Sequence, residues 1–108
     1  MIQYTTPSVG VRLTGVTVAP SQVDVAKLTL QPVTKDHRPI GESIDVVPQV
    51  TIDGSDTVVA ATLTQQQSAA MPLGYYQAMV NLKLKDGRRI ANLPTYGQVL
   101  RNLHEQVM

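Results

Sequence analysis

The residues whose types could do chemistry are few and far apart in this chain. His37 and His104 are separated by most of the sequence, and His104-Glu105 lacks the second histidine at helical spacing that a zinc motif needs. Asp53-Gly54-Ser55-Asp56 resembles the start of an oxygen-ligand loop but lacks the further acidic positions and closing glutamate of a calcium-binding loop. We therefore expect a plain turn at Asp53–Asp56 and surface positions for both histidines.

Nucleophilic and phosphate-binding motifs are also missing from the sequence. The serines have no nucleophile-elbow context, and no glycine-rich loop of the kind that cradles phosphate is present. The chain has 0 cysteines, which excludes a disulfide framework and thiolate chemistry. We expect no catalytic residue, no metal site and no cofactor, and therefore no enzyme.

The strongest charge feature is a cluster of four cations around one turn, formed by Lys83, Lys85, Arg88 and Arg89. Like charges that face each other across a strand pair are mildly destabilising, so an anionic partner is one explanation for the cluster. The favoured explanation is a solvated hairpin tip whose long cationic side chains discourage edge-to-edge aggregation. An acidic protein surface remains an alternative. Nucleic acid is disfavoured because no aromatic stacking platform accompanies the charges.

The elements that would position these residues are strands. In residues 75–85, apolar side chains alternate with Gln, Asn and Lys, which is the period-two pattern of a strand with one buried face. Asp86-Gly87 follows and suits a two-residue hairpin loop. That loop predicts a register with Lys85 opposite Arg88, Leu84 opposite Arg89, Leu82 opposite Ala91 and Val80 opposite Leu93.

Further short strands are expected at residues 8–18, 24–32, 39–47, 49–52 and 56–64. The intervening segment at residues 64–74 is too short for a stable independent helix and predicts one helical turn that crosses between sheets. About seven strands separated by turn signals predict an all-β, antiparallel sandwich of the immunoglobulin or fibronectin type.

After Pro94 the pattern changes to helical spacing. Thr95 and Gln98 resemble a capping box, and an apolar stripe recurs at Val99, Leu100, Leu103 and Val107. This pattern predicts a C-terminal helix that packs either on its own sandwich or on a partner subunit. The expected organisation is an N-terminal arm at residues 1–7, a β-sandwich domain at 8–94 and a C-terminal helix at 95–108.

Composition limits the partners. The chain of 108 residues has a formal net charge of +1, too small to indicate a long nucleic-acid footprint or electrostatic membrane docking. No apolar run approaches the roughly 18 residues of a membrane span, and the N-terminus lacks the features of a signal peptide. We expect a soluble, unprocessed protein.

One long stretch, ATLTQQQSAAMPLGYYQAMVNLKLKDGRRIA, resembles a pattern found in small β-sandwich structural proteins of phage tails, necks and heads. The N-terminal domains of upper baseplate proteins are a comparable type, and VRLTG and LRNLHEQVM are similar to that group too. The resemblance implies a virion protein, assembled in the host bacterial cytoplasm, whose partners are other virion proteins or copies of itself. MPLGYY also resembles a fibronectin-like stretch in which Tyr76 would be the corner tyrosine. The cysteine pair and core tryptophan of antibody-type domains are absent.

The predicted function is therefore structural, through protein–protein contacts. The expected contact residues are Ile2 and Tyr4 in the arm, Tyr75 and Met79 on the outer side of the central strand, and Leu100, Leu103 and Val107 near the C-terminus. Two alternatives remain open. One is a small carbohydrate- or protein-binding module, and the other is a nucleic-acid-binding β domain that uses the Lys83–Arg89 hairpin.

Overall fold

Two strands of 11 residues each, β2 (Val23–Val33) and β6 (Gly74–Leu84), form the longest pairing in the computed structural model, which describes residues 1–92 and 94–108. They run antiparallel from Val23 opposite Leu84 to Val33 opposite Tyr75. Alternate residues of both strands are buried, so the period-two pattern read from the sequence is the one that buries an inner face. Eleven residues span about 36 Å as a strand, which accounts for most of the 45 Å long axis of the molecule.

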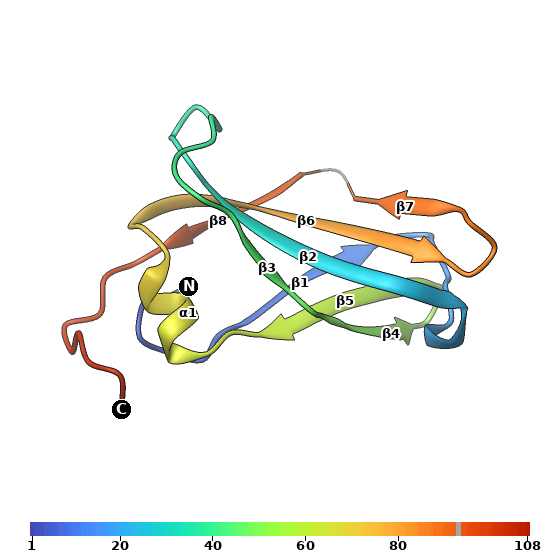
Figure 1. Cartoon of the computed structure of the whole chain (residues 1–108), viewed down its shortest axis with the longest axis horizontal. Coiled ribbons are helices and arrows are strands. Elements are labelled where there is room, and N and C mark those ends of the chain that lie inside the picture. The colour runs from blue at the N-terminus through green and yellow to red at the C-terminus, as the bar shows by residue number, and fades with distance from the viewer. Residues whose placement is uncertain (93) are drawn as a thin grey trace.

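The five-stranded sheet is completed on both sides of this pair. β3 (Ile44–Val46) pairs with the free edge of β2, and β7 (Arg89–Ala91) and β8 (Thr95–Val99) pair with the free edge of β6. β7 lies opposite residues 81–83 of β6, whereas β8 lies opposite residues 74–78. Figure 1 shows β7 and β8 following one another along the same side of β6.

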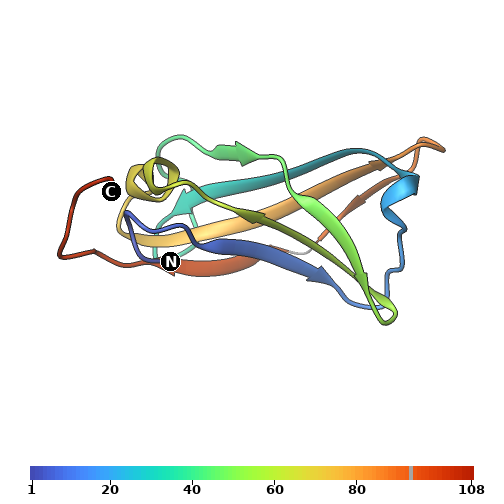
Figure 2. The same cartoon turned by 90° about the horizontal axis from the view of Figure 1, so that it is seen from below.

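A second, three-stranded antiparallel sheet has the order β1 (Ser8–Leu13), β5 (Asp56–Thr62), β4 (Gln49–Asp53). β4 and β5 form a hairpin whose turn contains Gly54 at φ +62°, a conformation that glycine adopts without steric cost. The plain turn expected at Asp53–Asp56 is confirmed. Figure 2 shows the two layers, with β1 in blue on one side and β2 and β6 in teal and orange on the other.

Three short connections carry the chain between the sheets. The 3-10 helix η1 (Pro20–Gln22) leads into β2, residues 47–48 carry the chain from β3 to β4, and α1 (Gln65–Ala70) leads from β5 toward β6. Thr64 caps α1 by accepting from the Gln67 amide at 3.1 Å, while the Gln67 side chain accepts from the Thr64 amide at 2.9 Å. The single helical turn predicted for this segment is confirmed.

The core between the sheets is built from aliphatic residues. Val9, Val11, Leu13 and Val59 come from the smaller sheet, and they face the buried residues of the larger one, which are Leu28, Leu30, Ala78, Val80, Leu82 and Val99. Leu63 and Met71, which stand just before and just after α1 in the chain, complete the core. The all-β, antiparallel, two-sheet architecture expected from the sequence is thus confirmed.

The prediction of a C-terminal helix over residues 95–108 is wrong. Thr95–Val99 form strand β8, and the residues after Leu100 form neither helix nor strand. The spacing of Val99, Leu100, Leu103 and Val107 imitates a helical stripe, but only Val99 of these four is buried. The edge of β6 offers backbone hydrogen bonds and an inner-face site for Val99, and a short amphipathic helix has no such tertiary partner.

The predicted register of the Asp86-Gly87 hairpin is wrong by one residue. Lys83 pairs with Arg89 and Leu82 with Ile90, because the Leu84 amide donates to the Arg88 carbonyl oxygen at 2.8 Å and closes a three-residue loop. Gly87 has φ +93°, which suits the last residue of a three-residue loop of this kind. The inner face therefore continues through Ile90, and not through Ala91. The predicted pairing of Leu93 falls outside the described residues.

Residues 1–7, predicted as an arm, lie against the C-terminal segment of the same chain. Ile2 forms a parallel bridge with Leu100, and the amides of Gln3 and Leu100 donate to the carbonyl oxygens of Leu100 and Met1, at 3.0 and 2.7 Å. Thr5 is fastened to α1 through Ser68, whose hydroxyl donates to the Thr5 carbonyl oxygen at 2.7 Å and accepts from the Thr5 amide at 3.1 Å. Both ends of the chain thus meet at one end of the molecule.

A first prediction concerns Thr57, a fully buried residue of β5. Its hydroxyl donates to the Val16 carbonyl oxygen at 2.7 Å and accepts from the Val18 amide at 2.9 Å, which joins the β1–η1 connection to the sheet. Thr57→Val keeps the shape but leaves both backbone groups unpaired, so we expect a loss of about 1–3 kcal/mol in the free energy of unfolding. Urea denaturation measures it, with Thr51→Val on the exposed face of β4 as the control. Equal stability of the two variants would contradict the role of Thr57.

A second prediction concerns the cross-strand pair of Tyr76 and Gly97. A Cβ atom on Gly97 would lie 2.5 Å from the Tyr76 ring, so the half-buried ring covers the glycine directly. The Tyr76 hydroxyl has no hydrogen bond to any described residue, and the corner-tyrosine bond expected from the sequence is not observed. We expect Gly97→Ala to destabilise by about 1–3 kcal/mol through overpacking. The loss should shrink in a Tyr76→Ala background, which a double-mutant cycle detects; additive effects would refute the contact.

Candidate functional site

The chemistry-bearing residues singled out in the sequence do not assemble into a reactive site. His37 lies in the loop between β2 and β3 and stacks on Tyr96 of β8, with ring centroids 3.7 Å apart and an interplanar angle of 11°. His104 lies in the C-terminal segment, where its amide donates to the Asn102 side chain at 2.9 Å. Within residues 1–92 and 94–108, no three His, Cys, Asp or Glu residues are grouped so that they could hold a metal ion. Both histidines are exposed, as predicted.

The two carboxylates of the β4–β5 turn are occupied by structural contacts. Arg12 of β1 binds Asp53 and lies 3.5 Å from a carboxylate oxygen of Asp56. The other oxygen of Asp56 accepts from the Gly15 amide at 2.8 Å. These contacts tie two turns at the same end of the smaller sheet, so both carboxylates are engaged in structural bonds.

The observed register separates the four cations into two groups, Lys85 and Arg88 at the hairpin loop and Lys83 and Arg89 on the paired strands. Arg88 forms an ion pair with Asp86 at 2.8 Å, and Lys85 lies in the loop with its amide bonded to the Gln22 carbonyl oxygen at 2.9 Å. Lys83 and Arg89 face each other across β6 and β7, where Arg89 also donates to the Asn81 side chain at 3.2 Å. The directly opposed cations are therefore Lys83 and Arg89, and not Lys85 and Arg88.

Two groups have a pKa that departs from its ordinary value. Hydrogen bonds from the Arg88 amide and then from its side chain hold the pKa of Asp86 below its usual value. Its carboxylate therefore adds stability above the pKa of the unfolded state and loses that contribution as pH falls through the folded pKa. Burial raises the pKa of Tyr76. The contribution of its neutral phenol group to folding stability is therefore present at neutral pH and is lost as pH rises through the folded pKa. Neither shift belongs to a cluster of reactive groups.

The predicted contact residues fall into two separate groups. Ile2, Leu100, Leu103 and Val107 gather in the two terminal segments, together with Met108, which sequence reasoning did not include. We call these five residues the terminal patch. Tyr4 is half-buried in the same region and has φ +60°. Tyr75 and Met79 lie on the outer face of β6 and are half-buried, far less exposed than the tail residues.

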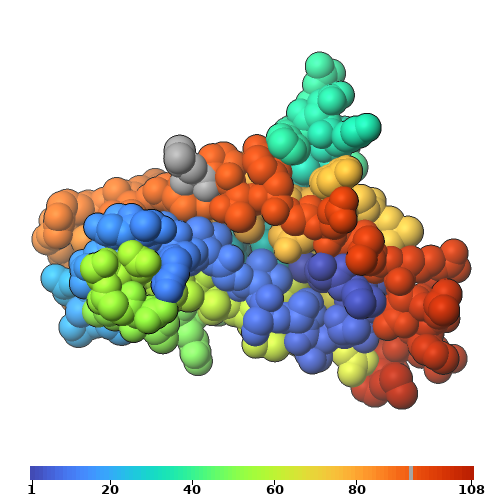
Figure 3. All heavy atoms as spheres, turned by 180° about the vertical axis from the view of Figure 1, so that it is seen from behind, coloured from blue at the N-terminus to red at the C-terminus, as the bar shows by residue number. Residues whose placement is uncertain are grey.

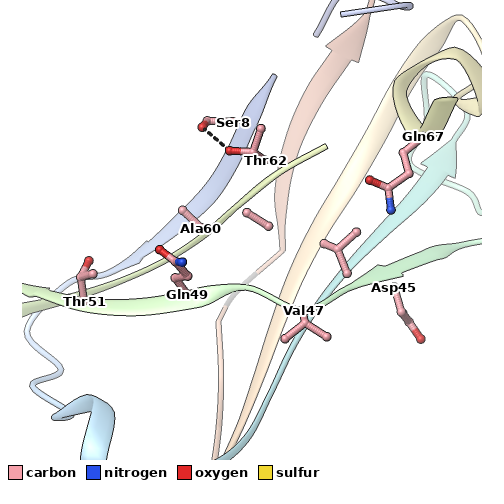
Figure 4. A pocket seen from close by; sticks show the side chains of 10 residues that line it. Ser8, Asp45, Val47, Gln49, Thr51, Ala60, Thr62 and Gln67 are labelled. Atoms are coloured by element: carbon pink, nitrogen blue, oxygen red, sulfur yellow. Dashed lines mark hydrogen bonds between the residues drawn. The ribbon is translucent and has the colours of Figure 1, made fainter. Parts of the chain in front are cut away.

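A hollow of about 560 Å³ lies where β3 passes into β4. It exists because the β4–β5 ladder stops at Gln49 opposite Ala60, so that β5 runs on without a β4 partner. Figure 4 shows Gln49 and Gln67 on its two sides, and Ser8 hydrogen-bonded to Thr62 at 3.4 Å along its wall. Its one carboxylate, Asp45, accepts from the Thr29 hydroxyl at 2.7 Å. The groove has no nucleophile beside a base.

A second hollow of about 290 Å³ lies on the outer face of the five-stranded sheet, and its lining residues are Thr29, Gln31, Gln77, Met79 and Asn81. Sequence reasoning marked only Met79 among them. The other four could have been assigned to the outer face from the alternation of β2 and β6, because they occupy the positions that do not face the core. Tyr96 also joins this face, opposite Gln77, and the erroneous helix prediction hid it.

Comparison with known proteins identifies no relative. No protein-family model matches the chain, and no curated protein or solved structure matches it significantly. Among the described residues, no helix has the length and apolar character needed to cross a membrane.

A third prediction tests the opposed cations of β6 and β7. Because Lys83 lies opposite Arg89, we expect Arg89→Glu to be more stable than Arg89→Gln by about 0.2–1 kcal/mol, since it replaces repulsion by attraction. Urea denaturation at low salt measures the difference, and 1 M salt should reduce it through screening. If the glutamate variant were the less stable one, the two side chains would not interact as the register implies.

Proposed function

We propose that this chain is a non-enzymatic assembly protein that acts through contacts of its terminal patch with copies of itself or other proteins. The observation that carries the proposal is the exposure of apolar side chains in the C-terminal segment. Leu103 and Met108 are 92% and 95% exposed, and Leu100 and Val107 are both 53% exposed. Single exposed apolar residues are common, but a contiguous group of them marks an interaction site.

The anchoring of this segment supports the same proposal. Its base is fixed, because the Met1 ammonium group donates to the Gln98 carbonyl oxygen at 2.8 Å and the Asn102 side-chain nitrogen donates to the Gln3 carbonyl oxygen at 3.1 Å. Beyond Asn102 the bonds that involve side chains are exposed ones, such as the Arg101–Glu105 ion pair at 2.7 Å. Figure 1 shows this segment leaving the end of β8 and extending beyond the sheets. The last residue is held by one exposed bond, in which the Met108 amide donates to the Gln65 side chain of α1 at 2.5 Å. A fixed base with an end held only by exposed bonds is suited to docking on a neighbour.

We propose a phage virion as the setting, as a tail, baseplate, neck or capsid accessory protein assembled in the host bacterial cytoplasm. The support for this setting is the sequence resemblance over the segment from β5 to β7. In a virion, a contact that is weak in one subunit pair is repeated around a symmetric ring or lattice, and the repeats add up to a stable assembly.

We propose further that the sandwich is of the immunoglobulin or fibronectin type. The order β1-β5-β4 in one sheet and β2-β6-β8 in the other matches the order of strands B, E, D and C, F, G of that type. The loop from β5 to β6 contains α1 at the place where the type has its connection between sheets. No counterpart of its first strand is present among the described residues.

The experiment is a truncation that ends at Asn102 and so removes Leu103, Val107 and Met108 of the patch while it keeps the bonds to Gln3. We expect the full chain to form oligomers whose mass, measured by light scattering, falls to that of a monomer on truncation. The melting temperature should change little, because the removed residues bury little surface. Leu103→Ser/Val107→Ser should reproduce the dissociation, whereas His104→Ser/Gln106→Ser is the matched control. A full chain that stays monomeric at high concentration would refute self-assembly.

A further inference from the structure

The outer face of the five-stranded sheet has an ordered arrangement of side chains that the terminal patch does not explain. Across β2, β6 and the strands beside β6, the register aligns Gln31 with Gln77 and Tyr96, and Val25 with Lys83 and Arg89. Between these two rows, Lys27 lies opposite Asn81. Successive rows are about 7 Å apart, so the face extends for about 20 Å from Gln77 to Lys83. It changes from aromatic and amide groups at one end to cations at the other.

The hollow in the middle of this face lies above the pairing of β2 with β6. The ladder between β6 and β7 ends at Asn81 and the ladder between β6 and β8 begins at Ala78, so Met79 has no paired strand residue on that side. The Asn92 side chain accepts from the Val80 amide at 2.7 Å, which satisfies the backbone where the ladder is broken. The hollow itself is lined by side chains of β2 and β6, which are the residues around Met79 that point away from the core.

The hydrogen-bonding groups around the hollow are partly free. The Gln77 amide, which donates and accepts, makes no hydrogen bond with another described residue. The Gln31 amide group donates to the carbonyl oxygens of Pro32, Ile40 and Gly41, at 2.9, 3.4 and 3.3 Å, which holds this side chain at the rim and leaves its oxygen available. Such groups match hydroxyls, which also donate and accept.

The cationic end of the face is unbalanced. Lys27, Lys83 and Arg89 are exposed, and none of the three forms an ion pair with a described residue. Asp45 on β3 is held by the Thr29 hydroxyl at 2.7 Å, and Asp24 lies in the bulge of β2 next to Val25 without an ion pair to a described residue. Repulsion between opposed cations is relieved when an anion binds them together.

At the aromatic end of the face, the loop between β2 and β3 packs against Tyr96. His37 has φ +63°, an uncommon conformation for a residue with a side chain, and its ring covers Tyr96. The loop is closed by the Thr34 amide, which donates to the Arg38 carbonyl oxygen at 2.8 Å. Figure 3 shows this loop, in turquoise, standing out from the body of the molecule. The stacked rings provide a flat surface at the end of the amide row.

We propose that the outer face of the five-stranded sheet binds an acidic oligosaccharide. Sugar hydroxyls would bond to Gln77 and Gln31 around the hollow, a sugar ring would lie near the His37–Tyr96 stack, and carboxylate or sulfate groups would bind Lys83, Arg89 and Lys27. Single-stranded nucleic acid fits the face less well, because its phosphates need cations along the whole path and its bases need several stacking surfaces. On the strands, the three cations lie at one end. The loop at the other end carries Lys35 and Arg38 together with Asp36, and no cation lies in the row of Thr29 and Met79 between them. This inference is independent of the assembly role of the terminal patch.

The test is isothermal titration calorimetry of the full chain with three acidic hexasaccharides, from polygalacturonate, hyaluronan and heparin. We expect at least one to bind, and its methyl-esterified or desulfated counterpart to bind at least about tenfold more weakly, because charge-assisted hydrogen bonds are lost. Lys83→Gln/Arg89→Gln should weaken binding by a similar factor. The control, Arg12→Gln/Arg101→Gln, lowers the net charge equally but changes residues away from this face.

The amide row is tested separately by Gln77→Ala, which should weaken binding several-fold, against Gln49→Ala on β4 of the smaller sheet. Circular dichroism melts establish that each variant is folded. Absence of binding to all three acidic sugars would overturn the proposal, as would equal losses in the two charge-matched variants. Tighter binding of a twelve-residue oligothymidylate, lost in Lys83→Gln/Arg89→Gln, would overturn it in favour of nucleic acid.

Discussion

The pairing of β2 with β6 is the interaction on which the rest of the structure depends. No turn connects these strands, and about forty residues of chain lie between Val33 and Gly74. Closing a loop of that length costs entropy that the long ladder and the shared inner face must offset. Once the pair is formed, β3 has an edge to join on one side, and β7 and β8 have an edge on the other. The β2–β6 pair is therefore the centre to which the other strands of the five-stranded sheet are attached.

Where the chain leaves a ladder, small polar side chains take over the backbone bonding. Thr57 does this for the connection after β1, Ser68 for the N-terminal residues and Asn92 for the break between β7 and β8. Thr57 and Ser68 are fully buried, and every described buried side-chain nitrogen or oxygen has a partner. A core with no Phe and no Trp buries little area per residue. Complete hydrogen bonding at these junctions is therefore a large part of what fixes one arrangement.

The sequence predicted those parts of the fold whose signal is local. Alternation identified β2 and β6, and the shortness of the run at residues 64–74 limited α1 to a single turn, because each pattern needs only its neighbours in the chain. The hairpin loop was predicted one residue too short, since Asp86-Gly87 is compatible with both two- and three-residue loops. β8 was missed because its partner in β6 lies about twenty residues earlier, and short apolar runs do not distinguish strand from helix. The same error hid Tyr96, and with it the aromatic end of the outer face.

β8 is also the element that keeps the two proposed surfaces apart. Its alternation directs Tyr96 and Gln98 outward while Gly97 lies under the Tyr76 ring and Val99 enters the core. The bridge between Ile2 and Leu100 then fixes the point at which the tail leaves the sheet. Because the ladder ends there, the tail beyond it can bind a neighbour without displacing a strand, and the outer face keeps its geometry. A helix at this position would have left the edge of β6 unpaired near Gln77, where an exposed edge invites unspecific strand pairing. Strand β8 therefore protects that edge, contributes Tyr96 to the outer face and ends where the tail with the terminal patch begins.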